Sequence, residues 1–214
     1  MAAPISYWEE VKRKAVHLSS LWMVAITILL PRTDLLYPHL LLCGIFALCL
    51  AITLISEHDF ANNGPYLGRL YGKLFGKMLR SEVYPGQWIV SGGAPVLAAA
   101  LLVNILFPPQ VAAAAMAVML TGDAAAALIG RRFGKHKLCN GKSWEGTISF
   151  AVVSAAAVTG VLLLDNAAPA MYLAVVPAVI VAALVELFTT QIRIDDNFTI
   201  PLAAGTLLML AYAS

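Results

Sequence analysis

Charge is the scarcest property of this 214-residue sequence: Asp, Glu, Lys and Arg make up only 12% of it, against 60% apolar residues. A soluble domain carries about 25% charged and about 45–50% apolar residues, so an ordinary soluble domain and a disordered chain are both excluded. The chain also lacks a basic excess, with 14 Lys and Arg against 12 Asp and Glu, and its three cysteines have no CxxC or metal-binding spacing. The sequence predicts an all-α integral membrane protein that does not bind nucleic acid.

Seven apolar runs reach or approach the roughly 17–25 residues that a membrane-spanning helix needs. All but one of the 14 Lys and Arg residues precede the first run or follow the second, fourth and sixth; Arg32 is the exception. Because Lys and Arg accumulate on the cytosolic side, we expect a cytosolic amino terminus and cytosolic loops 57–87, 131–146 and 189–197. Residues 1–214 would form one multi-pass domain in a cell inner membrane or the endoplasmic reticulum. The runs are Ala15–Leu30, Pro38–Ser56, Trp88–Phe107, Gln110–Gly130, Thr147–Leu164, Ala170–Phe188 and Phe198–Ala213.

The segment Leu67–Arg80, inside the first of these loops, repeats apolar residues at spacings of three and four, with cations between them. This pattern predicts an amphipathic helix along the cytosolic membrane surface. Such a helix serves either as an entrance or lid for a lipid or simply as an anchor.

Asp123 lies inside an otherwise apolar run, about two helical turns or roughly 10 Å before Gly130. A carboxylate at that depth costs on the order of 2–3 kcal/mol and usually faces a cavity, a partner charge or a metal. A structural hydrogen bond between helices is the alternative.

The residues after Asp123 alternate cations with glycines, a composition suited to phosphate because cations neutralise its oxygens and glycines allow close approach. A loop that only touches lipid head groups would look similar. A P-loop is excluded, because His136 stands where that motif needs glycine. The candidate phosphate contacts are Arg131, Arg132, Gly134, Lys135 and Lys142.

Further polar residues lie near the same expected membrane face. Glu186, Asp195, Asp196 and Asn197 supply oxygen ligands that suit Mg²⁺ together with substrate phosphates, although Asp and Asn also cap helices. At the other end of the chain, spacings of three and four place Arg13 or Lys14 on the same helix face as His17.

Three segments of the chain carry a further pattern: Arg13-Lys14-x-x-His17, then Gly122-Asp123 with Ile129-Gly130-Arg131-Arg132-Phe133-Gly134-Lys135 and Lys142-Ser143-Trp144-Glu145-Gly146, and finally Asp195-Asp196-Asn197-x-Thr199-Ile200-Pro201. Together they resemble the CTP-dependent lipid kinases, which include dolichol kinase, phytol kinase and CTP-dependent diacylglycerol kinase. The segments occur in the family's order and span nearly the whole chain. The middle one is also similar to the phosphatidate cytidylyltransferases, but their long carboxy-terminal signature is absent, which favours phosphoryl transfer.

The resemblance implies transfer of the CTP γ-phosphoryl group to the hydroxyl of a membrane lipid alcohol, such as a polyprenol, phytol or diacylglycerol, with Mg²⁺ as cofactor. A CTP:lipid cytidylyltransferase is one alternative, and a small transporter using Asp123 and Glu186 as an ion path is another. The sequence leaves open whether the protein forms a homo-oligomer. The implied roles are catalysis for Asp123, Asp195, Asp196 and His17, metal binding for Asp123, Asp196 and Glu186, and nucleotide binding for Arg13, Lys14, Arg131, Arg132, Gly134, Lys135, Lys142, Ser143, Glu145 and Asn197.

Overall fold

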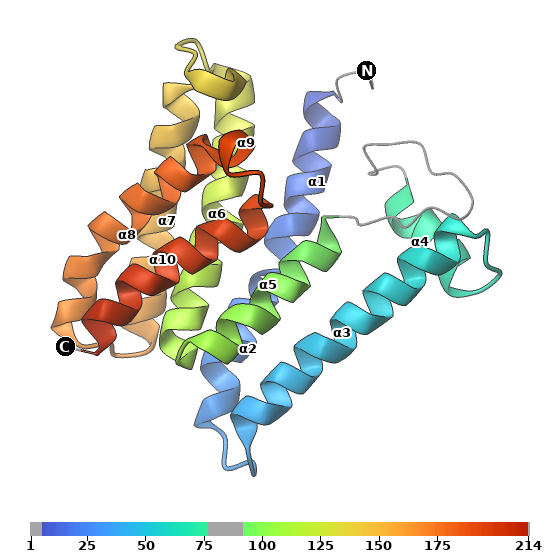
Figure 1. Ribbon diagram of the computed structural model, residues 1–214, viewed down its shortest axis with the longest axis horizontal. Helices are drawn as coiled ribbons and strands as arrows, with labels where there is room; N and C mark the ends of the chain where they lie inside the picture. Colours follow the sequence, from blue (N-terminus) through green and yellow to red (C-terminus); the bar gives the residue numbers. More distant parts are fainter. Residues whose placement is uncertain (1–5, 77–91, 214) are drawn as a thin grey trace.

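The computed structural model describes residues 6–76 and 92–213, and every regular element within these two ranges is a helix (Figure 1). This confirms the all-α prediction for the described part of the chain. The elements are α1 (Tyr7–Ser19), α2 (Leu21–Leu29), the 3-10 turn η1 (Leu30–Arg32), α3 (Pro38–Ala61), α4 (Leu67–Phe75), α5 (Gly93–Leu106), α6 (Pro109–Phe133), the 3-10 turn η3 (Cys139–Gly141), α7 (Trp144–Leu164), α8 (Pro169–Leu187), α9 (Thr189–Ile192) and α10 (Asp196–Tyr212).

Five helical segments in the described ranges are long and apolar enough to cross a membrane: Tyr7–Arg32, α3, α6, α7 and α8. They suggest a multi-pass membrane protein. Helices α5 and α10 are shorter, with 14 and 17 residues. The spans expected at Trp88–Phe107 and Phe198–Ala213 therefore stay predictions, and the first four residues of the former lie outside the described ranges.

Helix α6 forms the centre of the bundle, and it packs most extensively against α7 (Figure 1). From Val111 to Leu120 its side chains are essentially inaccessible to solvent, and alanine dominates this stretch. Small residues allow helix backbones to approach closely where no hydrophobic effect drives association. At Gly122 a Cβ atom would lie 2.3 Å from the Ser154 Oγ and 2.7 Å from Phe150, so α7 leaves no room for a side chain there.

The first helix begins earlier than the apolar run Ala15–Leu30 indicates. A capping box starts it, because the Glu9 amide donates to Ser6 Oγ at 3.2 Å and the Ser6 amide donates to Glu9 Oε2 at 2.7 Å. The charged residues that precede the apolar run thus form the first turns of α1. The helix is interrupted at Ser20, whose amide bonds back to His17, before α2 continues.

Helix α4 confirms the expected amphipathic helix over Leu67–Phe75, while residues 77–80 of the predicted segment lie outside the described ranges. Tyr71 packs between Phe60 and Phe75, with ring centroids 5.6 and 5.3 Å away. At Gly68 a Cβ atom would lie 2.5 Å from the α3 backbone, so only glycine permits this approach. Leu70 and Leu74 stay exposed, so only part of the apolar face of α4 is covered.

The polar connections gather at one end of the molecule. Figure 1 shows the amino terminus, α4, the loop after α6 and α9 at this end, and the α2–α3 turn and the carboxyl terminus at the opposite end. At that opposite end Arg32 donates to Asp165 Oδ1 at 2.6 Å and to the Leu164 carbonyl at 2.9 Å, and Gln110 donates to the other Asp165 oxygen. The one Arg outside the basic loops therefore carries its own counter-charge.

Candidate functional site

A cavity of about 970 Å³ opens among α1, α3, α5, α6, α8 and the segment that starts α10. Its volume lies at the upper end of the range usual for ligand pockets, about 300–1,000 Å³. Most of the residues that the sequence singled out line it, although they come from separate parts of the chain. They are Arg13, Lys14, His17, Asp123, Arg131, Lys142, Ser143, Glu186, Asp195, Asp196 and Asn197.

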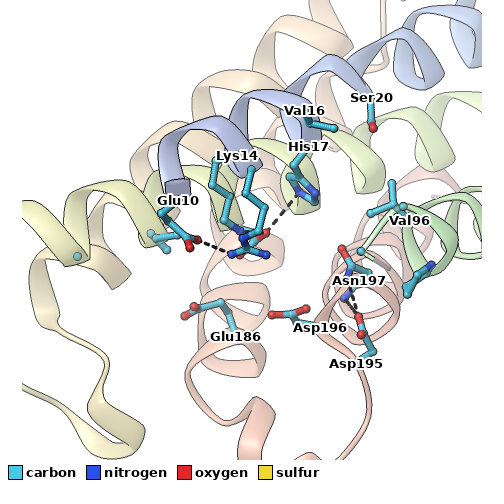
Figure 2. Close-up of a pocket in the computed structure, with 18 of the residues that line it drawn as sticks. Glu10, Lys14, Val16, His17, Ser20, Val96, Glu186, Asp195, Asp196 and Asn197 are labelled. Carbon is cyan, nitrogen blue, oxygen red and sulfur yellow. Dashed lines mark hydrogen bonds and ion pairs between the residues drawn. The ribbon is translucent and has the colours of Figure 1, made fainter. Parts of the chain in front are cut away.

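Two side chains of α1 lie against the negative charge of Asp123 and compensate it. Lys14 Nζ donates to Asp123 Oδ2, and His17 Nε2 lies 3.4 Å from the same oxygen (Figure 2). The Lys14 side chain is only 3% exposed, so this pair is largely withdrawn from solvent. The spacing allowed Arg13 or Lys14 to share a helix face with His17, and the structure places Lys14 with His17 against Asp123. Asp123 thus has a partner charge and also faces a cavity, as its burial predicted.

Glu10 is a functional candidate that the sequence reasoning missed. It is 2% exposed, accepts a hydrogen bond from Arg13 and lies 3.7 Å from Arg131 Nη1 on α6. Two guanidinium groups on one wall of the cavity therefore share a single buried carboxylate. One signal was available: Glu10 precedes Arg13 by three residues and Lys14 by four, which places all three on one side of a helix.

The contacts of Glu10 and Asp123 belong to one stripe of α1. Tyr7, Glu10, Lys14 and His17 follow each other at spacings of three, four and three, so they share the helix face toward α6. Arg132 lies over the Tyr7 ring, with 5.8 Å from its Cζ to the ring centroid. Polar and aromatic contacts with the carboxy-terminal half of α6 therefore hold this end of α1.

Lys142 reaches the cavity from the loop between α6 and α7. Its Nζ lies 2.5 Å from Glu186 Oε1 on α8 and also donates to the Glu186 carbonyl. Asn140, in the left-handed conformation at φ 60°, exchanges hydrogen bonds with Gln191 of α9 at 2.7 and 3.0 Å. The loop is thereby fastened to α8 and α9, which fixes the position of Lys142.

Asp195 and Asp196 lie at the start of α10, where the first caps the helix and the second is a carboxyl group whose charged form is disfavoured. Asp195 caps the helix, because its Oδ1 accepts the Asn197 amide at 2.9 Å. Burial raises the pKa of the Asp196 carboxyl to about 6, and the carboxylates of Asp123 and Asp195 add to this effect against the smaller influence of Lys14 and Lys142. An added cation close to Asp196 would relieve this repulsion.

Four of the expected site residues are not among those that line the cavity: Arg132, Gly134, Lys135 and Glu145. Glu145 accepts hydrogen bonds from the His136 ring at 2.8 Å and from the backbone amides of Lys135 and His136. At Gly134 a Cβ atom would lie 2.2 Å from the Gly130 carbonyl, so the chain turns there without room for a side chain. In the structure Gly134 and Glu145 shape the loop, and the expected contact of all four residues with CTP stays a prediction.

Asp123, Asp196 and Glu186 are the carboxylates expected to hold Mg²⁺. They fit the ion only if a bound substrate supplies further oxygen ligands. Within the described ranges, no three His, Cys, Asp or Glu side chains are grouped so that they could hold a metal. Asp123 and Glu186 are each paired with a lysine, whereas Asp196 forms no ion pair with any residue in 6–76 or 92–213. Mg²⁺ commonly takes one or two carboxylates and completes its shell with phosphate oxygens and water. Asp196 with a bound triphosphate matches that pattern better than a cage made by the protein alone.

The lining also includes residues to which the sequence reasoning gave no role. Val16 and Ser20 lie along α1 and its end, beyond His17, and Val96 lies near them on α5 (Figure 2). Ile52, Thr53 and Ser56 belong to the lining from α3. No polar motif marks these positions, because their significance depends on three helices from separate parts of the chain lining one cavity.

The comparisons with known proteins give one relative without an assigned activity. The chain is 27% identical, over 194 residues, to the uncharacterized protein RP860 of Rickettsia prowazekii (strain Madrid E); the match covers 91% of this chain and 90% of that protein. No protein-family model matches the chain. No solved structure matches it either.

Proposed function

We propose that this protein is a CTP-dependent lipid kinase, which transfers the γ-phosphoryl group of CTP to the hydroxyl of a membrane lipid alcohol on the cytosolic face. The observation that carries the proposal is the composition of one cavity. Cations from α1, α6 and the following loop line it together with the carboxylates of Asp123 and Asp196, and apolar side chains line its other part. The proposal further rests on the resemblance of the three segments to that family.

Phosphoryl transfer asks a protein mainly for positioning and charge neutralisation. Arg13, Arg131 and Lys142 are the cavity cations that would contact the triphosphate. Their positions are set by Glu10 and Glu186, which lie on the cavity wall and hold them through ion pairs. Losing one such charged contact should cost roughly 1.5–3 kcal/mol of binding.

The acceptor hydroxyl would lie between His17 and the Asp123–Asp196 side of the cavity. Its oxygen attacks the γ-phosphorus, the bond from that phosphorus to the β–γ bridging oxygen breaks, and CDP leaves. The hydroxyl proton passes to Asp123 or to His17, whose Nε2 lies 3.4 Å from the Asp123 carboxylate. Asp196 would hold Mg²⁺, whose charge would offset the negative charge that develops on the phosphate oxygens.

The test uses purified protein in lipid nanodiscs with γ-³²P-labelled CTP, Mg²⁺ and a panel of polyprenol, phytol and diacylglycerol. Label in the extracted lipid is the expected result, and its chromatographic mobility identifies the acceptor. Label released as pyrophosphate on addition of phosphatidate would instead establish a cytidylyltransferase. Absence of both products, with nucleotide-independent flux of ions in liposomes, would contradict the kinase and favour a transporter.

A further inference from the structure

The cavity has an apolar part whose rim is itself exposed. Val16 on α1 and Ile52 on α3 both line the cavity, yet they are 39% and 49% exposed. A side chain that lines the cavity and is also exposed on the outside stands at an opening of the cavity. Val96, which lines the cavity from α5, is 3% exposed and therefore lies on the inside of that opening.

The wall between these residues offers little to a polar head group. The Thr53 hydroxyl donates to the Cys49 carbonyl at 2.9 Å, and the Ser56 hydroxyl donates to the Ile52 carbonyl at 2.7 Å. Since both hydroxyl protons are used within α3, the hydrogen-bond donors of these side chains are satisfied. A hydrocarbon chain loses no hydrogen bond against such a wall.

The opening leads to the apolar outer surface of α3. Leu48 and Ile55 are one turn before and after Ile52, at 61% and 57% exposure, and neither belongs to the cavity lining. Helix α3 is among the segments long and apolar enough to cross a membrane. Its exposed face would then meet lipid, so the cavity communicates sideways with the interior of the bilayer at Ile52 and Val16.

We propose that the passage from Ile52 and Val16 inward to Val96 is the binding subsite for a hydrocarbon chain of the lipid acceptor. The proposal rests on the proposed kinase function and adds where the acceptor lies. Ser20, at the break between α1 and α2, also lines this passage. Figure 2 places Val16, Ser20 and Val96 at the end of the cavity away from Glu186, with His17 between them. A chain in this passage brings its hydroxyl to His17 and Asp123.

The first test is photolabelling in nanodiscs with a long-chain alcohol that carries a diazirine in its chain, followed by mass spectrometry of the labelled peptides. We expect labelling at Val96, which lines the cavity and is only 3% exposed. Ile52→Trp should reduce that labelling at least fivefold by narrowing the rim. Leu48→Trp is the matched control on the same helix, because Leu48 is exposed but does not line the cavity. Absence of label at Val96 in the wild type, or equal loss in both variants, would overturn the subsite.

The second test is kinetic. Ile52→Trp, and independently Val16→Trp, should raise KM for a long-chain alcohol at least fivefold, while KM for CTP and transfer to a short-chain, water-soluble alcohol change less than twofold. An equal loss with long and short alcohols would contradict the subsite. If the wild type transfers phosphate to no alcohol, the kinase function fails, and the labelling result still decides whether a hydrocarbon chain occupies this passage.

Discussion

Lys14 and Asp123, separated by 109 residues in the sequence, form an ion pair between α1 and α6. The pair explains how a carboxylate persists in the interior of an apolar helix. A charge buried without a partner costs several kcal/mol, whereas a paired and hydrogen-bonded one costs far less. The same pair ties the amino-terminal helix to the wall of the cavity.

Asp123→Asn should nearly abolish phosphoryl transfer and also lower stability, because it leaves the Lys14 ammonium buried without a counter-charge. The loss of stability should be on the order of 3–5 kcal/mol. The double variant Lys14→Met/Asp123→Leu should recover most of this stability and none of the activity. Thermal unfolding in detergent and the lipid-labelling assay measure the two effects separately. Wild-type activity in a normally folded Asp123→Asn protein would refute the role of this carboxylate.

Glu10→Gln should reduce kcat/KM for CTP about tenfold, since Arg13 and Arg131 lose the carboxylate that they share. In an Arg131→Gln background the same change should have less than a threefold effect, because residues that act through one contact are not additive. Steady-state kinetics of the four proteins give the coupling. Asp34→Asn removes an equal charge from an exposed position in the turn before α3 and serves as the control. Fully additive effects would show that Glu10 does not act through Arg131.

Gly122→Ala should destabilise the bundle by about 1–3 kcal/mol, because its Cβ would overlap Ser154 and Phe150 of α7. Gly160→Ala is the matched substitution within α7 itself. Nothing lies within 4 Å of a Cβ at Gly160, and alanine favours the helix by about 0.5–1 kcal/mol. Melting temperatures of the two variants should therefore move in opposite directions. A parallel shift would contradict the tight α6–α7 contact.

Asp196→Asn should stabilise the protein without bound metal above pH 6 and have little effect at pH 4. The pKa of this carboxyl is raised from 3.8 to about 6, so the folded state holds a proton that the unfolded state releases. Folding stability is then lost as pH rises from about 4 to about 6, and a neutral amide avoids that loss. Melting curves in EDTA across this pH range test the expectation. An unchanged difference between wild type and variant at all pH values would exclude it.

The spacing of apolar and polar residues predicted most of the helices and the amphipathic α4, since helical periodicity is a local property. It also predicted that Asp123 would meet a cavity, a partner charge or a metal. A carboxylate deep in an apolar run is costly unless something compensates it, and its depth can be read from the sequence. The identity of the partner required the α1–α6 packing, and the alternatives Arg13 and Lys14 could be separated only there.

Glu10, Ile52 and Val96 show what local patterns leave out. In the sequence Glu10 looks like any charged residue at the start of a helix. Its role becomes visible only in the folded chain, where Arg131 of α6 lies beside it. Ile52 and Val96 are ordinary apolar residues whose importance comes from the cavity that α1, α3 and α5 line together. Conversely, Glu145 and Gly134 belong to a motif suited to phosphate, yet their contacts in the structure are within the loop. Glu145 bonds the His136 ring, and Gly134 allows a tight turn.

The contact between Arg32 and Asp165 has a consequence for biosynthesis. The two residues are 133 positions apart, and Asp165 follows α7 in the chain. At about 5–20 residues per second, synthesis delivers the aspartate roughly 7–27 s after the arginine. During that interval Arg32 lacks the aspartate that it contacts in the folded protein. The contact between the amino-terminal helices and the turn after α7 therefore forms only when that turn has been synthesised.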